Sequence, residues 1–201
     1  MKGFRDTIAR LVPACMLLAC LLATTAALAA PAQEPLPRES VYQLPATLTD
    51  QDGKSWDWRA KRGTPQVVAM FYTSCQYVCP LIVDSGKAVE RALSADERAK
   101  LGILLISMDP ARDDPEALKS VADKRKLDAD RWSLASPAPD NVRGVAGVLG
   151  VRYRQLADGE FNHTSALVLL DREGRIVART EQIGSQVDPE FVAEVRRLLA
   201  P

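Results

Sequence analysis

Two nearly continuous apolar runs stand out in the pattern of hydrophobic and polar positions along the chain. Residues 66–72 (QVVAMFY) and 101–107 (LGILLIS) have the length of strands and lack the polar alternation of a half-exposed strand. Such runs are typical of strands that are buried on both faces of a parallel sheet. The pattern therefore predicts two central, fully buried strands.

Helical periodicity and capping residues mark the segments between and after these strands. Apolar residues recur at helical spacing after residue 78. Asp-Pro pairs at 114–115 and 188–189 predict helix starts, because aspartate caps a helix and proline fits its first position. Asp140 and Gly150 are the cap and stop of another helix. The pattern predicts helices over 78–93, 115–126, 141–149 and 189–199.

Turn residues define two predicted hairpins. Asp52-Gly53 lies between short apolar segments and predicts an N-terminal β-hairpin. The segment 171–174 separates strands predicted at 165–170 and 175–180, and so short a connection makes them antiparallel. With a short strand at 132–135, the order is β-hairpin, β, α, β, α, β, α, β, β, α. This order predicts an α/β fold with a mixed central sheet and helices on both faces.

The first 30 residues have the pattern of an export signal. Three basic residues precede an uncharged run, residues 11–30, that ends in small residues. The run is about the ~20 residues needed to cross a bilayer, so a cleaved signal peptide and an uncleaved N-terminal membrane anchor both stay open. Cys20 follows a sequence that loosely resembles a lipobox, which adds lipidation as a third alternative. All three place the domain in the periplasm, or anchored in the inner membrane and facing the periplasm.

The rest of the chain is predicted to be a linker and one domain. Residues 31–45 hold four prolines and are interpreted as a linker. Residues 46–201 are long enough for a single well-buried core. After residue 30 the chain has 23 basic and 25 acidic residues, a net charge near −2, without a basic stripe. This balance argues against a nucleic-acid partner.

Only two of the four cysteines, Cys75 and Cys79, belong to the predicted domain. A disulfide across so short a loop restricts the unfolded chain little, which disfavours a purely structural bridge. Cys79 is expected in the first turn of a helix, where the helix dipole lowers the pKa of a thiol. Residues four apart meet on one side of a helical turn. The pair is thus predicted to be a dithiol that can attack a disulfide or bind a metal ion. A cysteine pair at the first strand–helix junction, with a closing hairpin and helix, is also the layout of a thioredoxin-like fold.

His163 is the single histidine of the chain and precedes the strand predicted at 165–170. In a thioredoxin-like fold that loop faces the cysteine loop, which makes His163 a candidate third metal ligand; the alternative is an ordinary polar surface residue. Two thiolates and one imidazole suit copper, since thiolates prefer Cu(I) and an added histidine accommodates Cu(II). Structural zinc would want a fourth protein ligand, and two cysteines are too few for an iron–sulfur cluster.

Asp109 and Arg112 follow the second buried strand, at the carboxyl edge of the sheet where such folds place their sites. The carboxylate of Asp109 is a candidate ligand. We favour instead an Asp-Pro turn that shapes the loop and forms a salt bridge with Arg112. The three tryptophans are predicted to be packing residues: Trp56, Trp58 and Trp132.

Three segments in this order resemble the SCO/SenC family of copper proteins. They are TSCQYVCP at 73–80, SMDPARDDPE at 107–116, and His163 before LVLLDREGRI. The likeness extends from about residue 41 to residue 199. It implies that 46–201 is a thioredoxin-like SCO domain and that Cys75, Cys79 and His163 are copper ligands.

The resemblance also implies a function and partners. The family delivers copper to, or reduces the thiols of, the dinuclear copper centre of cytochrome c oxidase. The expected partners are a copper-accepting protein, such as subunit II of cytochrome c oxidase, and a thiol reductant. The chain departs from the family at Asp114, where threonine is frequent, and at Asn162, where many members have aspartate. Without that carboxylate, His163 lacks one partner that would orient its ring.

Two other activities remain open beside a metallochaperone. In a thiol–disulfide oxidoreductase, Cys75 and Cys79 act as a redox pair through a mixed disulfide, and His163 is not required. A peroxiredoxin-like peroxidase shares the fold and the Thr73-Ser74-Cys75 segment. It also wants a proline upstream in the same loop, and Pro65 lies too early, before the strand.

Overall fold

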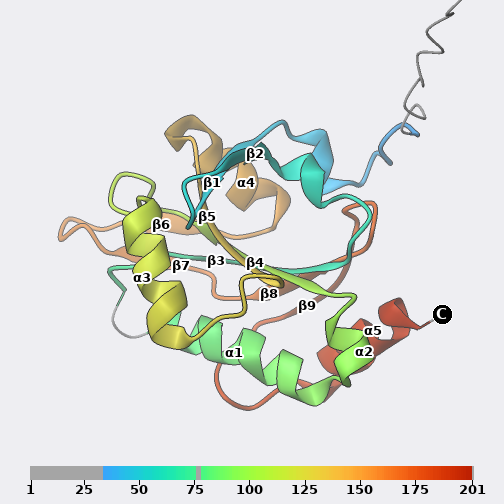
Figure 1. Ribbon diagram of the computed structural model, residues 1–201. Helices are drawn as coiled ribbons and strands as arrows, with labels where there is room; N and C mark the ends of the chain where they lie inside the picture. The colour runs from blue at the N-terminus through green and yellow to red at the C-terminus, as the bar shows by residue number, and fades with distance from the viewer. Residues whose placement is uncertain (1–33, 76–77, 201) are drawn as a thin grey trace, which may run out of the picture. The chain divides into compact units, whose positions relative to one another are not determined.

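The computed structural model describes residues 34–75 and 78–200, and its compact folded unit begins at Leu36. A mixed sheet of strand order β2-β1-β5-β4-β3-β8-β9 forms the centre of this unit (Figure 1). Parallel pairing joins β3 to β4 and β4 to β5, and the other neighbours are antiparallel. The strands are β1 (Thr47–Asp50), β2 (Ser55–Asp57), β3 (Gln66–Phe71), β4 (Gly102–Ser107), β5 (Trp132–Pro137), β8 (Leu167–Leu170) and β9 (Ile176–Thr180).

Helices cover both faces of the sheet. Helices α1, α3 and α5 lie on one face and α4 lies on the other (Figure 1). The helices are α1 (Val78–Ala92), α2 (Ala95–Arg98), α3 (Pro115–Arg125), α4 (Val142–Val148) and α5 (Pro189–Leu199). The predicted α/β, thioredoxin-like architecture with an N-terminal β-hairpin is confirmed. Over residues 34–75 and 78–200, none of the helices has the length and apolar character of a membrane span.

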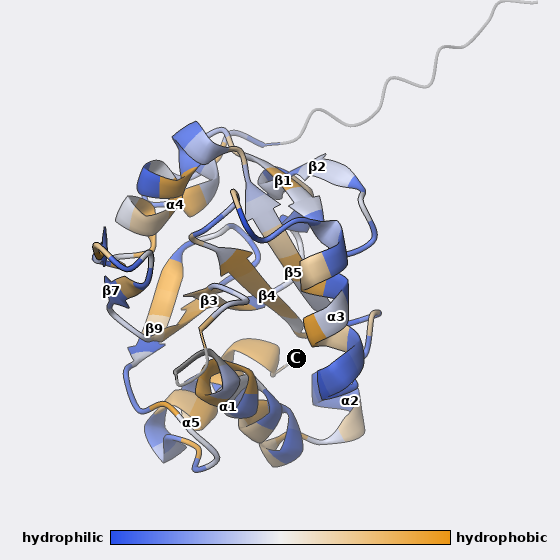
Figure 2. Cartoon of the chain, turned by 90° about the vertical axis from the view of Figure 1, so that its left-hand side faces the viewer, coloured by the Kyte–Doolittle hydropathy of each residue, from blue (hydrophilic) through white to orange (hydrophobic). Residues whose placement is uncertain are grey.

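The central strands are buried as their sequences predict. Every residue of β3 is buried, and β3 and β4 align in register from Gln66–Gly102 to Phe71–Ser107. Figure 2 shows these apolar strands enclosed between the helices. Trp58 and Trp132 are each only 1% exposed, which confirms their packing role. The carboxyl ends of two parallel strands therefore meet at one edge of the sheet, where the loops that follow them come together.

A small second sheet and the short helix α2 are elements that the sequence pattern does not predict. Strand β6 (Tyr153–Gln155) pairs with β7 (Phe161–His163), and Tyr153 stands opposite His163. Each strand has three residues, too few for a readable alternation of apolar and polar positions. The expectation that His163 lies in a loop is therefore wrong, because it ends a strand. The strand predicted from residue 165 begins at Leu167.

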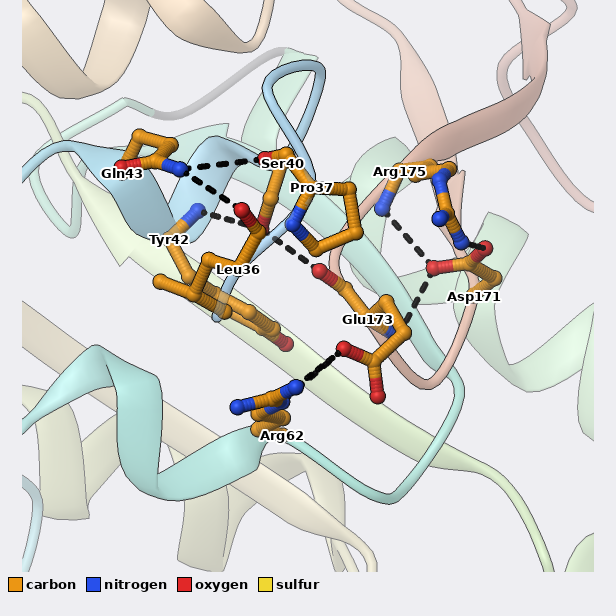
Figure 3. Close-up of polar contacts among 9 residues, drawn as sticks. All are labelled: Leu36, Pro37, Ser40, Tyr42, Gln43, Arg62, Asp171, Glu173 and Arg175. Carbon is orange, nitrogen blue, oxygen red and sulfur yellow. Dashed lines mark hydrogen bonds and ion pairs between the residues drawn. The ribbon is translucent and has the colours of Figure 1, made fainter. Parts of the chain in front are cut away.

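The folded unit includes residues 36–45, so the predicted linker of residues 31–45 overlaps it. The hydroxyl of Ser40 donates to the carbonyl of Glu173 at 2.5 Å, in the turn between β8 and β9 (Figure 3). The amide of Gln43 donates to two carbonyls of the same segment, those of Leu36 and Pro37. Tyr42 is buried at 1% exposure. This segment is thus held by hydrogen bonds and by burial.

Candidate metal centre

Cys75 lies in the loop that follows β3 and is 9% exposed. Its backbone N–H donates to the carbonyl of Tyr72 at 3.4 Å, which turns the chain sharply after the strand. Helix α1 begins at Val78, so Cys79 stands in the first helical turn, as predicted. Unpaired N–H groups at a helix start favour a thiolate. The side chain of Cys79 lies outside the described part of the chain.

His163 ends β7 and is half-buried. Its Nδ1 lies 3.2 Å from the carbonyl oxygen of Thr164. A carbonyl oxygen only accepts, so Nδ1 carries the proton and the lone pair of the neutral ring is on Nε2. Burial lowers the pKa of His163 below its ordinary value, and the Thr164 carbonyl opposes this effect. The ring is therefore kept in the neutral form that binds metals.

Tyr72 joins the cysteine loop to the strand that carries the histidine. Its ring centroid lies 5.9 Å from that of His163 in an edge-to-face arrangement, and 5.1 Å from that of Phe161. Its hydroxyl donates to Oε2 of Glu160 at 2.8 Å and also interacts with the side chain of Cys75. Burial and then the Glu160 hydrogen bond raise the pKa of Tyr72. Cys75 and His163 thus contact one and the same side chain.

Neither Tyr72 nor Glu160 is predicted from the sequence to be a functional residue. One signal was available for Tyr72, a tyrosine with a polar tip at the very end of a buried central strand. The sequence holds no such signal for Glu160, because its hydrogen bond with Tyr72 depends on how β6 and β7 pair.

Asp113 fixes the cysteine loop to the loop that follows β4. Its side chain is completely buried and accepts hydrogen bonds from the hydroxyls of Thr73 and Ser107, both at 2.6 Å. It also accepts from the backbone N–H of Thr73 at 3.1 Å. Burial raises the pKa of Asp113, and these hydrogen bonds oppose the increase. Thr73, two residues before Cys75, is therefore anchored to the loop that follows β4.

Arg112 connects the same loop to the β6–β7 hairpin. The predicted salt bridge between Asp109 and Arg112 is present, and Asp109 is buried. The guanidinium of Arg112 also donates to the carbonyl of Gly159, at the turn of the hairpin, at 2.5 Å. The carboxylate of Asp109 is engaged by an arginine, as expected for a residue that shapes the loop. Arg112 thereby holds the hairpin of His163 against the loop after β4.

Comparison with known proteins identifies the family of this chain. The family model for SCO1/SenC matches residues 36–200. The chain belongs to the SCO1/SenC family.

Solved and curated relatives agree with this assignment. The structure of Bradyrhizobium japonicum ScoI with copper bound is 28% identical, has a TM-score of 0.65, and aligns over 77% of this chain and 98% of that one. BsSco, described as a member of the Sco family of cytochrome c oxidase assembly proteins, is 21% identical with a TM-score of 0.67, over 84% of this chain and 97% of that one. At 21% identity, the likeness to BsSco shows that the two proteins share a fold.

A curated relative from Stutzerimonas stutzeri is named "Putative copper-binding protein". It is 33% identical over 86 residues, which are 42% of this chain and 41% of that protein. The match thus spans about two fifths of the length of that relative.

In this SCO1/SenC protein three segments meet around Tyr72: the cysteine loop, the loop after β4, and the β6–β7 hairpin. Among the side chains that the structure describes, no group of three cysteine, histidine, aspartate or glutamate residues could hold a metal ion. The predicted set of ligands includes Cys79, whose side chain does not belong to the described part of the chain. The other two predicted ligands, Cys75 and His163, both interact with Tyr72.

Proposed function

We propose that this SCO1/SenC protein is an exported copper metallochaperone that binds copper through Cys75, Cys79 and His163. It delivers the ion to the copper centre of a respiratory oxidase, or reduces the thiols of that centre. The observation that carries the proposal is the contact of Tyr72 with both Cys75 and His163. Family membership and the copper-bound ScoI relative support the choice of metal.

The donor set fits copper as a cargo that is held and then released. Two thiolates favour Cu(I), and the imidazole Nε2 accommodates Cu(II) as well. Thiols must lose their protons to bind, so loading releases protons and requires the reduced protein. Oxidation to a disulfide removes two of the three ligands. A thiol reductant therefore controls copper loading, and a thiolate of the acceptor takes the ion by ligand exchange.

The expected acceptor is a copper-binding protein such as subunit II of cytochrome c oxidase. The N-terminal 30 residues, which lie outside the described residues, are assigned to export or anchoring. This assignment places the domain in the periplasm, where the copper centre of the oxidase is accessible. Partner and location both rest on the sequence pattern and on the family.

The decisive experiment compares copper binding by wild type and by His163→Ala. Reduced apoprotein is loaded anaerobically with Cu(I), or in air with Cu(II), and bound metal is measured after desalting. We expect one copper per chain in the wild type. The variant should lose the thiolate-to-Cu(II) absorption and release Cu(I) to a chelator more readily. A variant that retains the wild-type affinity and spectrum would contradict the proposed ligand set.

Asn162→Ala is the matched control. Asn162 is the exposed neighbour of His163 on β7, so its removal perturbs the same strand without removing a predicted ligand. Copper binding by this variant should equal that of the wild type. Equal losses in both variants would trace the effect to the strand and not to the imidazole.

A thiol–disulfide oxidoreductase without copper delivery is the second candidate. The position of Cys79 in the first turn of α1 favours it, since that position supports a reactive thiolate. Disulfide exchange does not need His163, so His163→Ala should leave exchange with a model disulfide unchanged. A protein that exchanges disulfides at the wild-type rate but never binds copper would support this candidate.

A further inference from the structure

An open pocket of about 130 Å³ lies directly beside Cys75, between α1 and α3. Its walls are largely apolar, with Phe71 from β3, Pro80 and Val83 from α1, and Val121 from α3. A cavity of ~150 Å³ accepts a benzene-sized group, so this pocket has room for one aliphatic or aromatic side chain. The site needs no such pocket to hold a metal ion.

The edge of the pocket is basic. Lys124 lines it, is exposed, and has no ion pair or hydrogen bond among the described residues. Arg125 also lines it, and its guanidinium pairs with Asp84 of α1 while its Nε is buried without a hydrogen-bond partner. Lys87 of α1 donates to the carbonyl of Arg125 at 2.9 Å. Lys124 and Arg125 are the charged side chains that line the pocket, and Arg125 is paired with Asp84, so Lys124 leaves this edge with a net positive charge.

The two helices that form the pocket are fixed to each other. Arg125 and Lys87 both connect α3 to α1, one through a salt bridge and one through a backbone carbonyl. Figure 1 shows these helices side by side on the same face of the sheet. Because these contacts hold its two helices together, the pocket is largely formed before a partner binds, and this lowers the entropic cost of ordering side chains on binding.

We propose that this pocket is the docking site of the partner protein. It takes an apolar side chain from a partner segment that also carries a carboxylate, which contacts Lys124, and a cysteine close by. The apolar walls of the pocket favour an apolar side chain, and its basic edge favours a carboxylate. Because Cys75 lines the pocket, a cysteine next to these two residues would bring the partner's sulfur within reach of ligand or disulfide exchange. The inference rests on the proposed function, whose acceptor must approach Cys75.

Three short peptides provide the test: Ac-Asp-Phe-Cys-Gly amide, the same peptide with Lys in place of Asp, and the same peptide with Gly in place of Phe. Each is activated as a disulfide with 2-thiopyridine. A thiolate of the reduced full-length protein attacks the peptide sulfur and forms a new sulfur–sulfur bond. The bond to thiopyridine breaks, and thiopyridine leaves with the electron pair and takes up a proton. Its absorbance reports the rate, and no further oxidant is needed.

We expect the peptide with Asp and Phe to react about tenfold faster than the Gly peptide, because only the former buries an aromatic ring. It should react about threefold faster than the Lys peptide, as is typical of an exposed charge pair. Lys124→Glu should reverse the preference between Asp and Lys. Lys100→Glu is the matched control, an exposed lysine just before the start of β4, at the other end of the sheet, and it should change nothing.

Equal rates for the three peptides would overturn the docking site, as would identical effects of Lys124→Glu and Lys100→Glu. Concentration-dependent dimers that Lys124→Glu abolishes would also overturn it, since the pocket would then accept a second copy of this chain. Copper titration of the same samples separates the two proposals. A protein that binds copper through His163 but does not discriminate among the peptides retains the proposed function and loses only the docking site.

Discussion

The ring and the hydroxyl of Tyr72 make different contacts, and a single substitution can remove those of the hydroxyl while it keeps those of the ring. Tyr72→Phe keeps the ring against His163 and Phe161 but removes the hydroxyl that bonds Glu160 and Cys75. The lost hydrogen bonds should lower the free energy of unfolding by about 1–2 kcal/mol. Loss of a group that orients a ligand should weaken Cu(I) binding about tenfold. Urea unfolding and competition with a Cu(I) chelator measure the two effects.

Tyr153→Phe is the control for this substitution. Tyr153 stands opposite His163 in the β6–β7 hairpin and packs near Phe161, and no hydrogen bond of its hydroxyl is found among the described residues. Its change should leave both measurements unaffected. Should Tyr72→Phe lose stability and keep its copper affinity, the tyrosine supports the fold and does not position the ligands.

His163 offers a second test at the scale of one residue, because no other histidine contributes to its titration. In the reduced apoprotein, burial lowers the pKa of His163 below the ordinary value of 6.5. NMR of the ring protons should therefore give a midpoint below 6.5, and the same protein in concentrated urea should give about 6.5. The charged form is disfavoured in the folded state. The contribution of His163 to stability should consequently be constant above pH 6.5 and fall as the pH decreases from 6.5 through the folded pKa. A folded midpoint at or above 6.5 would show a solvated ring and would remove the argument for a neutral ligand.

At the scale of elements, the turn between β8 and β9 depends on a glycine for two separate reasons. Gly174 has φ +79, and a Cβ atom there would lie 2.5 Å from the ring of Tyr42. Gly53, in the β1–β2 turn, has φ +76 with nothing within 4 Å of such a Cβ. Gly53→Ala should cost about 1–2 kcal/mol from left-handed strain alone. Gly174→Ala should cost about 2 kcal/mol more, because the buried tyrosine must also move. Chemical denaturation of both variants gives the comparison, and equal losses would show that the turn and Tyr42 are not tightly packed.

The same elements explain how far the sequence predicts this structure. Apolar runs identify β3 and β4 because both strands are buried on two faces, and Asp-Pro caps identify α3 and α5 because capping is local chemistry. The β6–β7 hairpin is not predicted because each of its strands has only three residues, and none of these is fully buried. The hydrogen bond between Tyr72 and Glu160 cannot be predicted from the sequence for another reason. It joins residues about 90 positions apart, and only the packing of three loops brings Glu160 to the end of β3.

At the scale of the whole molecule, the prolines of residues 31–45 point to a linker, but burial and hydrogen bonding extend the folded unit to Leu36. Tyr42 and Val41 are almost completely buried, and burial of such side chains stabilises by about 1.5–3 kcal/mol each. The carbonyl of Leu44 also accepts from the indole of the buried Trp58 at 2.7 Å.

Chains that begin at residues 31, 36 and 46 test this boundary. The first two should unfold at the same urea concentration, because residues 31–35 precede the compact unit. The third loses two buried side chains and leaves a buried indole N–H unpaired, which together should lower the free energy of unfolding by about 4–6 kcal/mol. A loss of that size is comparable to the entire stability of many domains, so we expect this chain to be largely unfolded and unable to retain copper. If it were instead as stable as the chain from residue 31, the segment would be a linker after all, and Gly174→Ala would then cost no more than Gly53→Ala.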